Sequence, residues 1–460
     1  MSSSNGGSTS GRRVLSERFR SKLTIDPRFT RKTVSYQGNR GSPGFRWMKY
    51  KEAFSQSLVE DMLDWHRPNR LLDPFSGVGT SILTAAGQGL DATGIEIMPV
   101  GVFAASSIAD AANGLVVDDF VNESKSLLKH IESPGNTPSK HAFPHVRITR
   151  NAFSSQTERD LGKAREFLSM GKDCLVNRLL GFACMSVLEQ ISYTRKDGQF
   201  LRWDNRSGRS LRSKMHKGDI PSLAHALSHR LQEMTDDFPA VKKTFGGKPP
   251  RFITGSSLDL LRDFPSASID LVITSPPYAN RYDYTRTYAL ELAWMGLDQE
   301  GFSNLRQRML TATVENHSKI ETLRLSYAGT PDRFEQALSA YERQEALQEV
   351  LCILRDHVHE LGNPNVIRLL EGYFLEMAIV IAELSRILRP DGYVVMVNDN
   401  VQYHGEEVPV DFIFADIAEG VGFECVNIWQ LAKGKGNASQ QMGRFGRREI
   451  RKCVYRWRKK

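Results

Sequence analysis

Cysteine is scarce in this sequence, and its few copies stand far apart. The five cysteines are at positions 174, 184, 352, 425 and 453, so no Cys-x-x-Cys pair is present. That spacing does not match a zinc or dithiol motif, and we expect no metal site. A chain without paired cysteines is typical of a reducing compartment, and we expect a cytoplasmic protein.

Long apolar runs and a secretory leader are also missing. Charged residues interrupt the most apolar stretches every few positions, so none reaches the roughly 20 residues that cross a membrane. The first residues, MSSSNGGSTSGRR, are rich in serine and glycine and have no apolar centre. We therefore predict a flexible basic tail over residues 1–40, and no membrane partner.

Acidic residues are in the minority, because 61 lysines and arginines face 53 aspartates and glutamates. The net charge of +8 favours an anionic partner, most often nucleic acid. One basic cluster, residues 194–219, places aromatic side chains among arginines. Arginines can bind phosphates and aromatic rings can stack on bases, so Arg202, Trp203 and Arg206 are candidate DNA contacts. The alternative is a solvated charged face.

Strand-like and helix-like segments alternate along the chain. The predicted strands are RLLDPF (70–75), DATGIEI (91–97), RFITG (251–255), SIDLVIT (268–274), YVVMVND (393–399), FECVNIW (423–429) and RKCVYRW (451–457). Alternation with helices predicts an α/β fold with a mostly parallel sheet covered by helices on both faces. In such sheets, ligands bind beyond the carboxyl ends of the strands.

The segment DPFSGVGT (73–80) ends one predicted strand, and Glu96 ends the next. Gly77 and Gly79 let the backbone pass close to a ligand, and the following helix offers unpaired N–H groups. An acid at Glu96 can accept hydrogen bonds from two ribose hydroxyls. Ile82 leaves the motif GxGxxG incomplete, which disfavours a nicotinamide cofactor. The alternative is a tight turn followed by a surface acid.

A second motif, Ser275-Pro276-Pro277-Tyr278, caps the apolar strand before it. Neither proline can donate a hydrogen bond to a neighbouring strand, so the strand must stop there. Two prolines also hold the backbone in a fixed, extended direction. A rigid tip with a hydroxyl and an aromatic ring suits a reacting centre, although a structural turn is the alternative.

These motifs together resemble the S-adenosylmethionine-dependent DNA amino-methyltransferases, which methylate N4 of cytosine or N6 of adenine. The segment KYKEAFSQSLVEDML (49–63) is similar to one that helps hold the methionine end of the cofactor in some members, and LRPDGYVVMV (388–397) is similar to the turn and strand after the catalytic motif. The resemblance implies a Rossmann-like methyltransferase fold with a mostly parallel central sheet and largely helical insertions.

The resemblance also implies roles for the catalytic tip. The Ser275 hydroxyl and the Pro276 carbonyl would accept hydrogen bonds from the N–H groups of the target amine. Pro277 would fix the direction of these two acceptors. Tyr278 would stack on a base flipped out of the duplex. A serine at the first position resembles the cytosine-N4 group more than the adenine-N6 group. Arg281 and Tyr282 follow the tip as further candidate DNA contacts.

For the cofactor, the resemblance implies S-adenosyl-L-methionine. Its implied contacts are Asp73, Pro74, Phe75, Gly77, Gly79, Thr80, Glu96, Ile97 and Ser256. Asp73 would orient the amino group of the cofactor or cap the glycine turn. Ser256 and Ser257 stand where relatives often carry Gly-Asp-Ser, so the aspartate that contacts the adenine is replaced here.

Insertions interrupt the predicted core. We expect the tail over 1–40, the cofactor half over 41–118, a largely helical insertion over 119–250, the catalytic part over 251–298, a helical insertion over 299–365 and the C-terminal part over 366–460. Either insertion could recognise the target sequence or only buttress the sheet.

The leading interpretation is a site-specific cytosine-N4 DNA methyltransferase of restriction–modification or phage defence. A cognate restriction endonuclease or defence-system subunits are then candidate partners. The alternatives are an adenine-N6 enzyme, an RNA base methyltransferase and, from another class, an inactive nucleic-acid-binding subunit. The chain has no Pro-Cys pair. Methylation at carbon 5 of cytosine resembles reactions that need a Pro-Cys nucleophile, so its absence argues against that chemistry.

Overall fold

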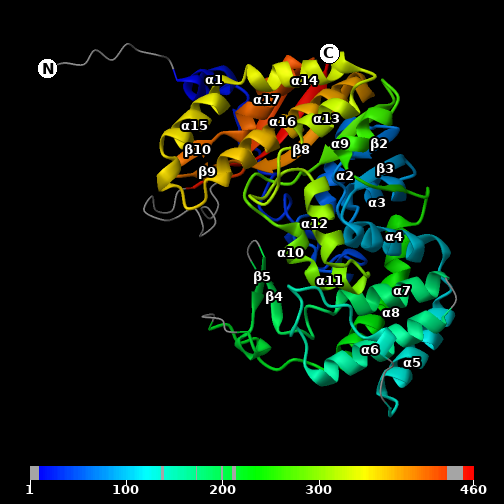
Figure 1. The fold of residues 1–460 in the computed structure, drawn as a ribbon. Helices are drawn as coiled ribbons and strands as arrows, with labels where there is room; N and C mark the ends of the chain where they lie inside the picture. The colour runs from blue at the N-terminus through cyan, green and yellow to red at the C-terminus, as the bar shows by residue number, and fades with distance from the viewer. Residues whose placement is uncertain (1–9, 136–138, 172–173, 198–199, 210–213, 433–448) are drawn as a thin grey trace.

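A mixed, mostly parallel sheet forms the centre of the molecule (Figure 1). The computed structural model describes residues 10–460 except 136–138, 172–173, 198–199, 210–213 and 433–448. Within these residues the sheet has eight strands in the order β1-β11-β12-β8-β7-β2-β3-β6. Their bounds are β1 Leu23–Thr24, β2 Arg70–Asp73, β3 Asp91–Glu96, β6 Arg251–Thr254, β7 Ile269–Thr274, β8 Leu388–Asp399, β11 Phe423–Gln430 and β12 Lys452–Lys459. The predicted strands are confirmed.

The strands from β6 to β8 pair in parallel, whereas β12 runs antiparallel to both β8 and β11. Every residue of β7 is buried, which suits a central strand with helices on both faces. Alternate residues enter different cores: Leu271 and Ile273 pack on one face, and Val272 packs on the other. This period of two explains why the strand reads as a continuous apolar run.

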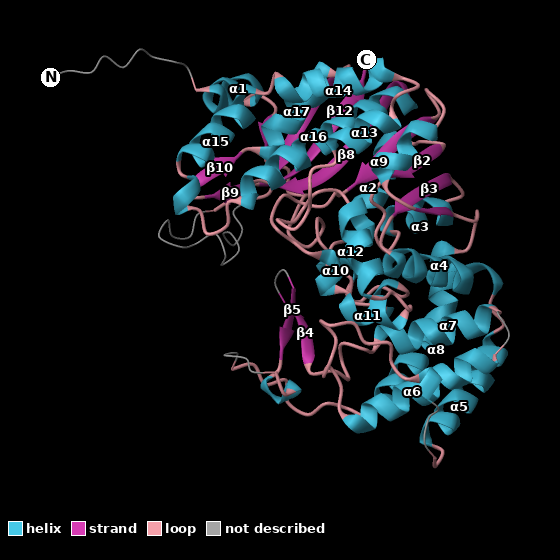
Figure 2. Cartoon of the chain, in the orientation of Figure 1, coloured by secondary structure: helices cyan, strands magenta, loops and turns pink. Residues whose placement is uncertain are grey.

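Helices cover both faces of the sheet (Figure 2). The helices α2 (Gln56–His66) and α3 (Thr80–Gly87) pack with Leu71 and Leu271 on one face. On the other face lie α9 (Ser257–Leu260), α14 (Pro331–Glu342), α16 (Asn365–Ile387) and α17 (Val410–Gly420). The prediction of a mostly parallel α/β sheet is therefore confirmed. No described helix has the length and apolar character to cross a membrane.

The first insertion forms a helical body below the sheet in Figure 1. Its elements are α5 (Val117–Glu132), α6 (Ser155–Met170), α7 (Leu175–Ser186), the hairpin of β4 (Thr194–Asp197) and β5 (Phe200–Trp203), and α8 (Leu223–Phe245). They share one apolar core with α4 (Pro99–Gly114) and α11 (Ala289–Trp294). The shared core fixes this body to α4 and α11.

After Tyr278 the chain forms α10 (Tyr284–Thr287) and α11, both within the predicted catalytic part. The second insertion, predicted over 299–365, contains α12 (Gln299–Arg308), α13 (Ile320–Ser326), α14 and α15 (Glu345–Asp356). Near α15 lies a small hairpin of β9 (Val401–Tyr403) and β10 (Glu406–Val408). The helical character of both insertions agrees with the apolar periodicity of their segments.

The N-terminal segment differs from the predicted flexible tail. Residues 1–9 lie outside the described part, but α1 (Gly11–Phe19) buries Leu15 and Phe19 in the main core, and β1 pairs with β11. Arg18 forms ion pairs with Asp416 and Glu419 of the region around α17. The two apolar residues are four apart, so they lie on one helix face and can dock there.

Candidate active site

The carboxyl ends of the parallel strands meet at one edge of the sheet, and a cavity opens there. The chain runs from β2 outward to β3 and β6, then returns to the other side of β2 with β7, so the strand order reverses at β2. Such a reversal is where open α/β sheets bind ligands. The lining includes Tyr50, Glu52, Pro74, Phe75, Gly77, Glu96, Ile97, Ser256, Ser275, Pro277 and Tyr284. Residues from both predicted motifs therefore face one space.

The glycine turn between β2 and α3 needs its glycines. Gly77 and Gly79 have φ values of +52° and +76°, a region that other L-residues seldom adopt. A Cβ on Gly77 would lie 3.1 Å from Cε1 of Tyr50, and one on Gly79 would lie 2.9 Å from Cβ of Ala105. The turn thus keeps its backbone close both to the cavity and to helix α4.

Asp73 lies beneath the cavity, where it holds the turn together. Its Oδ1 accepts hydrogen bonds from Phe75 N at 3.0 Å and from Thr274 Oγ1 at 2.7 Å, and the Ser81 hydroxyl donates to Oδ2. Burial raises the pKa of Asp73 to about 6, and these hydrogen bonds oppose that rise. The contacts link β2 to β7 and α3, which corresponds to the capping role. Thr80 is also buried below the turn.

Glu96 closes the floor of the cavity at the end of β3. Its Oε2 accepts a hydrogen bond from Gly77 N, and its Oε1 accepts one from Met98 N, both at 2.7 Å. Burial raises the pKa of Glu96 to about 7, although the two N–H groups favour the ionised form. Each carboxylate oxygen can accept a further bond. The group is therefore oriented by the backbone and retains acceptor capacity.

The two serines after β6 have different surroundings. Ser257 donates its hydroxyl to the carbonyl of Pro74, which ties α9 to the turn after β2. Ser256 precedes α9 and lines the cavity without capping the helix through its side chain. Gly255 N donates to the carbonyl of Glu96 at 3.0 Å. The Ser256 hydroxyl thus lies at the position where the resemblance implies the carboxylate of an aspartate.

The predicted catalytic tip, Ser275–Tyr278, follows the end of β7 at Thr274. Ser275 Oγ lies 3.1 Å from the hydroxyl oxygen of Tyr278, so the two hydroxyls are hydrogen-bonded. Ser275 and Pro277 face the cavity, whereas Pro276 is buried. Tyr278 is only partly exposed, and burial raises the pKa of its hydroxyl. The predicted amine acceptor and the predicted stacking ring are therefore in contact with each other.

Lys452 is a neighbour of this tip that the local sequence does not reveal. Its Nζ lies 3.4 Å from the Tyr278 hydroxyl oxygen and 3.1 Å from Oδ1 of Asp399. Because β12 is antiparallel, its first residue lies at the same edge as the end of β8. Burial by itself lowers the pKa of Lys452, but Asp399 and Tyr278 raise it overall, so the amine stays charged.

Two further cavity residues come from the segment before the glycine turn. Tyr50 stacks on Tyr288 with ring centroids 4.9 Å apart. Glu52 accepts a hydrogen bond from the Tyr288 hydroxyl and also lines the cavity. This placement agrees with the expectation that segment 49–63 lies beside the bound cofactor, although the motifs alone did not single out these two side chains.

The candidate DNA contacts in the first insertion are arranged differently from the prediction. Trp203 is 9% exposed, and the Arg209 guanidinium covers its ring at 3.7 Å from the centroid. Arg206 forms two hydrogen bonds of 2.9 Å with Asp204, so it holds the turn after β5. Trp203 therefore packs in the apolar core of the helical body, with Arg209 over its ring, and does not present an open stacking surface. Arg202 is exposed, and residues 198–199 and 210–213 of this cluster lie outside the described part.

The candidate contacts after the tip lie close to the cavity. Arg281 has a φ of +66°, an uncommon value for arginine. Tyr282 packs edge-on against Tyr284, with ring centroids 4.8 Å apart, and Tyr284 lines the cavity. Both predicted residues are half-buried in this conformation.

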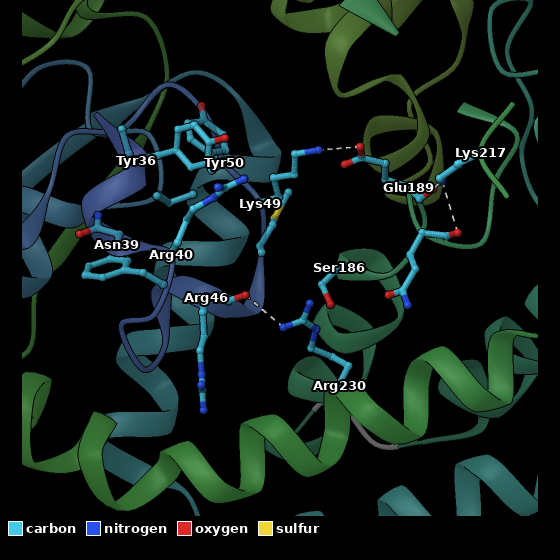
Figure 3. Close-up of a pocket in the computed structure, with 15 residues that line it drawn as sticks. Tyr36, Asn39, Arg40, Arg46, Lys49, Tyr50, Ser186, Glu189, Lys217 and Arg230 are labelled. Carbon is cyan, nitrogen blue, oxygen red and sulfur yellow. Dashed lines mark hydrogen bonds and ion pairs between the residues drawn. The ribbon is translucent and has the colours of Figure 1, made fainter. Parts of the chain in front are cut away.

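A second cavity separates the segment 36–53 from the helical body, and Figure 3 shows its lining. Its cations already have partners: Lys49 Nζ lies 2.8 Å from Oε1 of Glu189, and Arg230 donates to the carbonyl of Arg46 at 3.1 Å. Lys217 donates to several backbone carbonyls, and burial lowers its pKa to about 8. The Lys49–Glu189 and Arg230–Arg46 contacts hold the helical body against the N-terminal segment, whereas the Lys217 bonds stay within the helical body.

Comparison with known proteins gave three close relatives. The chain is 39% identical over 465 residues to the Type II methyltransferase M.AvaI of Nostoc sp. (strain PCC 7120) and to the protein of that name from Anabaena variabilis, covering 97% of this chain and 93% of each relative. It is 36% identical over 455 residues to the Type II methyltransferase M.BsoBI of Geobacillus stearothermophilus, covering 94% of this chain and 88% of that protein. No family model matches the chain, and no solved structure matches it.

Proposed function

This chain belongs to the type II methyltransferases, the site-specific DNA methyltransferases of restriction–modification systems, and we propose that it methylates the exocyclic N4 amine of cytosine. The observation that carries the proposal is the position of Ser275 and Glu96 in one cavity at the carboxyl edge of the sheet. A cognate restriction endonuclease is the partner that this role implies. The strand order, with antiparallel β12 between β8 and β11, supports a Rossmann-like methyltransferase fold.

We propose S-adenosylmethionine as the cofactor, and the residues present fit it. A Cβ on Gly77 would crowd the ring of Tyr50, which lines the cavity, and Glu96 lies beside the turn with acceptors suited to ribose hydroxyls. Ile97 and Phe75 offer apolar surface, and Ser256 offers a hydroxyl. When bound, the cofactor supplies an electrophilic methyl group on a sulfonium.

The tip would prepare the amine to attack. An exocyclic amine is a poor nucleophile because its lone pair is delocalised into the ring. Ser275 Oγ and the Pro276 carbonyl would accept hydrogen bonds from its two N–H groups. These hydrogen bonds would localise the lone pair on nitrogen and direct it at the methyl group. The bound cofactor would supply the methyl group and leave as S-adenosylhomocysteine. Ser275 Oγ and the Pro276 carbonyl would hold the nitrogen in place, and the amine proton that the methyl group replaces would pass to solvent.

Tyr278 and Ser275 must change partners before the amine can bind in this way. Their hydroxyls are hydrogen-bonded to each other, so an incoming base would replace that contact. Lys452 remains close enough to hold the Tyr278 hydroxyl while the ring packs on the base. We infer that Lys452 positions Tyr278 and does not itself contact the reacting atoms.

Product identification tests the base assignment. The purified full chain would be incubated with methyl-labelled S-adenosylmethionine and unmethylated genomic DNA, and the nucleosides separated by mass. We expect labelled N4-methylcytosine, because the tip begins with serine. Labelled N6-methyladenine would keep the mechanism and overturn the base. No label in the DNA would overturn the proposed function, whether or not the protein binds the cofactor.

Two substitutions of Tyr278 distinguish the contribution of its ring from that of its hydroxyl. Tyr278→Ala should lower kcat by about 10–100-fold, because base–aromatic stacking contributes roughly 1–3 kcal/mol. Tyr278→Phe keeps the ring and should lose much less. Single-turnover kinetics on both variants, with equilibrium cofactor binding as the control, distinguish the roles. Equal losses in both variants would assign the function of Tyr278 to its hydroxyl.

A further inference from the structure

Three potential metal ligands meet on the side of the molecule where α15 lies beside the β9–β10 hairpin (Figure 1). His357 follows α15, and Glu360 ends the short 3-10 helix Val358–Glu360. His404 lies in the turn of the hairpin. These residues come from two segments that are far apart in the sequence, and the methyl-transfer chemistry does not use them.

The donor atoms are close enough to share one ion. His357 Nδ1 lies 3.0 Å from Oε1 of Glu360, and His404 Nε2 lies 3.8 Å from Oε2 of the same carboxylate. One donor atom from each residue lies within 4.8 Å of the other two. Ligands about 2.0–2.2 Å from a tetrahedral zinc ion are separated by about 3.3–3.6 Å. Small side-chain rotations therefore suffice to bring all three to one ion.

The hairpin backbone places His404 for this contact. His404 and Gly405 have φ values of +50° and +82°, the signs that a two-residue type I′ turn requires. Asparagine is the usual residue at the first position, and histidine is among the few others that tolerate it. The His404 side chain is 9% exposed, and its ring lies 5.2 Å from that of His357. The turn thus directs the imidazole inward, toward Glu360.

We propose that His357, Glu360 and His404 bind a divalent transition-metal ion of the zinc class. Two imidazole nitrogens and one carboxylate oxygen suit zinc better than calcium or magnesium, which prefer oxygen ligands. Water would complete the coordination, since His357 and Glu360 are about half exposed. The proposal does not depend on which base the enzyme methylates.

Such an ion would join the hairpin to the segment after α15. The residue before His404 matters here, because the Tyr403 hydroxyl donates to the carbonyl of Ala279 at 2.5 Å. Ala279 directly follows the catalytic tip, so the hairpin supports the loop that carries Tyr278. A metal clamp on this hairpin would therefore stabilise the support of the tip from a distance.

Metal titration of the full chain tests the site. After treatment with a chelator, the protein would be titrated with Zn²⁺ by calorimetry and with Co²⁺ by visible absorption, which reports the ligand field. We expect one tight equivalent in the wild type. His404→Asn keeps a residue that suits the turn and should weaken binding at least tenfold. His357→Gln should do the same.

A second histidine pair provides the matched control. His225 and His229 lie one turn apart on α8, with ring centroids 4.7 Å apart, so they are the obvious competing site. The double variant His225→Gln with His229→Gln should leave the tight equivalent unchanged. Loss of binding in this control, or full binding in His404→Asn, would overturn the proposal. Zn²⁺ should also raise the Tm of the wild type and not that of His404→Asn.

Discussion

Replacing Ser275 by alanine is expected to lower kcat by about 10²–10³-fold while cofactor affinity stays within twofold. The loss is that of one preorganised hydrogen bond to the reacting group, which typically has this size. Ser275 lies at the end of β7, fixed by Pro276 and Pro277, so no other hydroxyl on the tip can take its place except that of Tyr278. Rapid-quench methyl transfer under single-turnover conditions measures the chemical step directly.

The same strand provides the control for this variant. Ser268 lies at the opposite end of β7, where its hydroxyl donates to the Pro265 carbonyl at 2.7 Å. Ser268→Ala removes a serine hydroxyl of the same type far from the cavity and should retain wild-type turnover. A Ser275→Ala enzyme that turns over as fast as Ser268→Ala would show that Ser275 Oγ does not accept a hydrogen bond from the amine.

Replacing Glu96 by glutamine is expected to weaken S-adenosylmethionine binding by about 10–100-fold. Hydrogen bonds to a charged group contribute about 1.5–3 kcal/mol, and the amide can no longer offer two ionised acceptors. The change also removes one of the acceptors for the N–H groups of Gly77 and Met98, so the turn itself loses order. Calorimetric titration measures the affinity, and thermal unfolding checks that the fold persists. An unchanged affinity would remove Glu96 from the cofactor site.

The pH dependence of binding gives a second readout of Glu96. Burial raises its pKa to about 7, so the free protein gains a proton there as pH falls from 8 to 6. Ribose hydroxyls donate best to the ionised carboxylate, and binding should therefore weaken toward pH 6. The probe 5′-methylthioadenosine keeps the ribose and has no amino-acid group that titrates in this range.

Glu96→Gln should remove most of that pH dependence. Asp73, whose pKa burial raises to about 6, remains in the variant and accounts for any residual slope at the acid end. Glu424→Gln is a suitable control, because this carboxylate lies on β11, is paired with Arg458 and is remote from the cavity strands. A pH profile that Glu96→Gln leaves unchanged would assign the titration to another group.

Local sequence was sufficient to predict the strands and helices of the sheet and to place the two motifs at the ends of their strands. Apolar runs of four to eight residues bounded by turn signals predict buried strands, and β2 and β7 agree with that pattern. The strands β3 and β6 also formed where they were predicted, although β6 has no fully buried residue. Once these strands are parallel, Glu96 and Ser275 must lie at the same edge. The shared edge was therefore predictable from strand direction, as was the need for glycine at Gly77, whereas the strand order that brings Glu96 and Ser275 to one cavity was not.

Contacts between distant segments required the tertiary structure. Lys452 reaches Tyr278 because antiparallel β12 enters the sheet beside β8, and no local pattern encodes that order. Leu15 docks α1 on the core, Trp203 turns into its hairpin and His404 meets Glu360 for the same kind of reason. The sequence by itself determined the alternation of strands and helices and the residues at the strand ends, because these depend on neighbours in the chain. Which side chains meet across the sheet edge depends on long-range packing, and only the folded chain decided it.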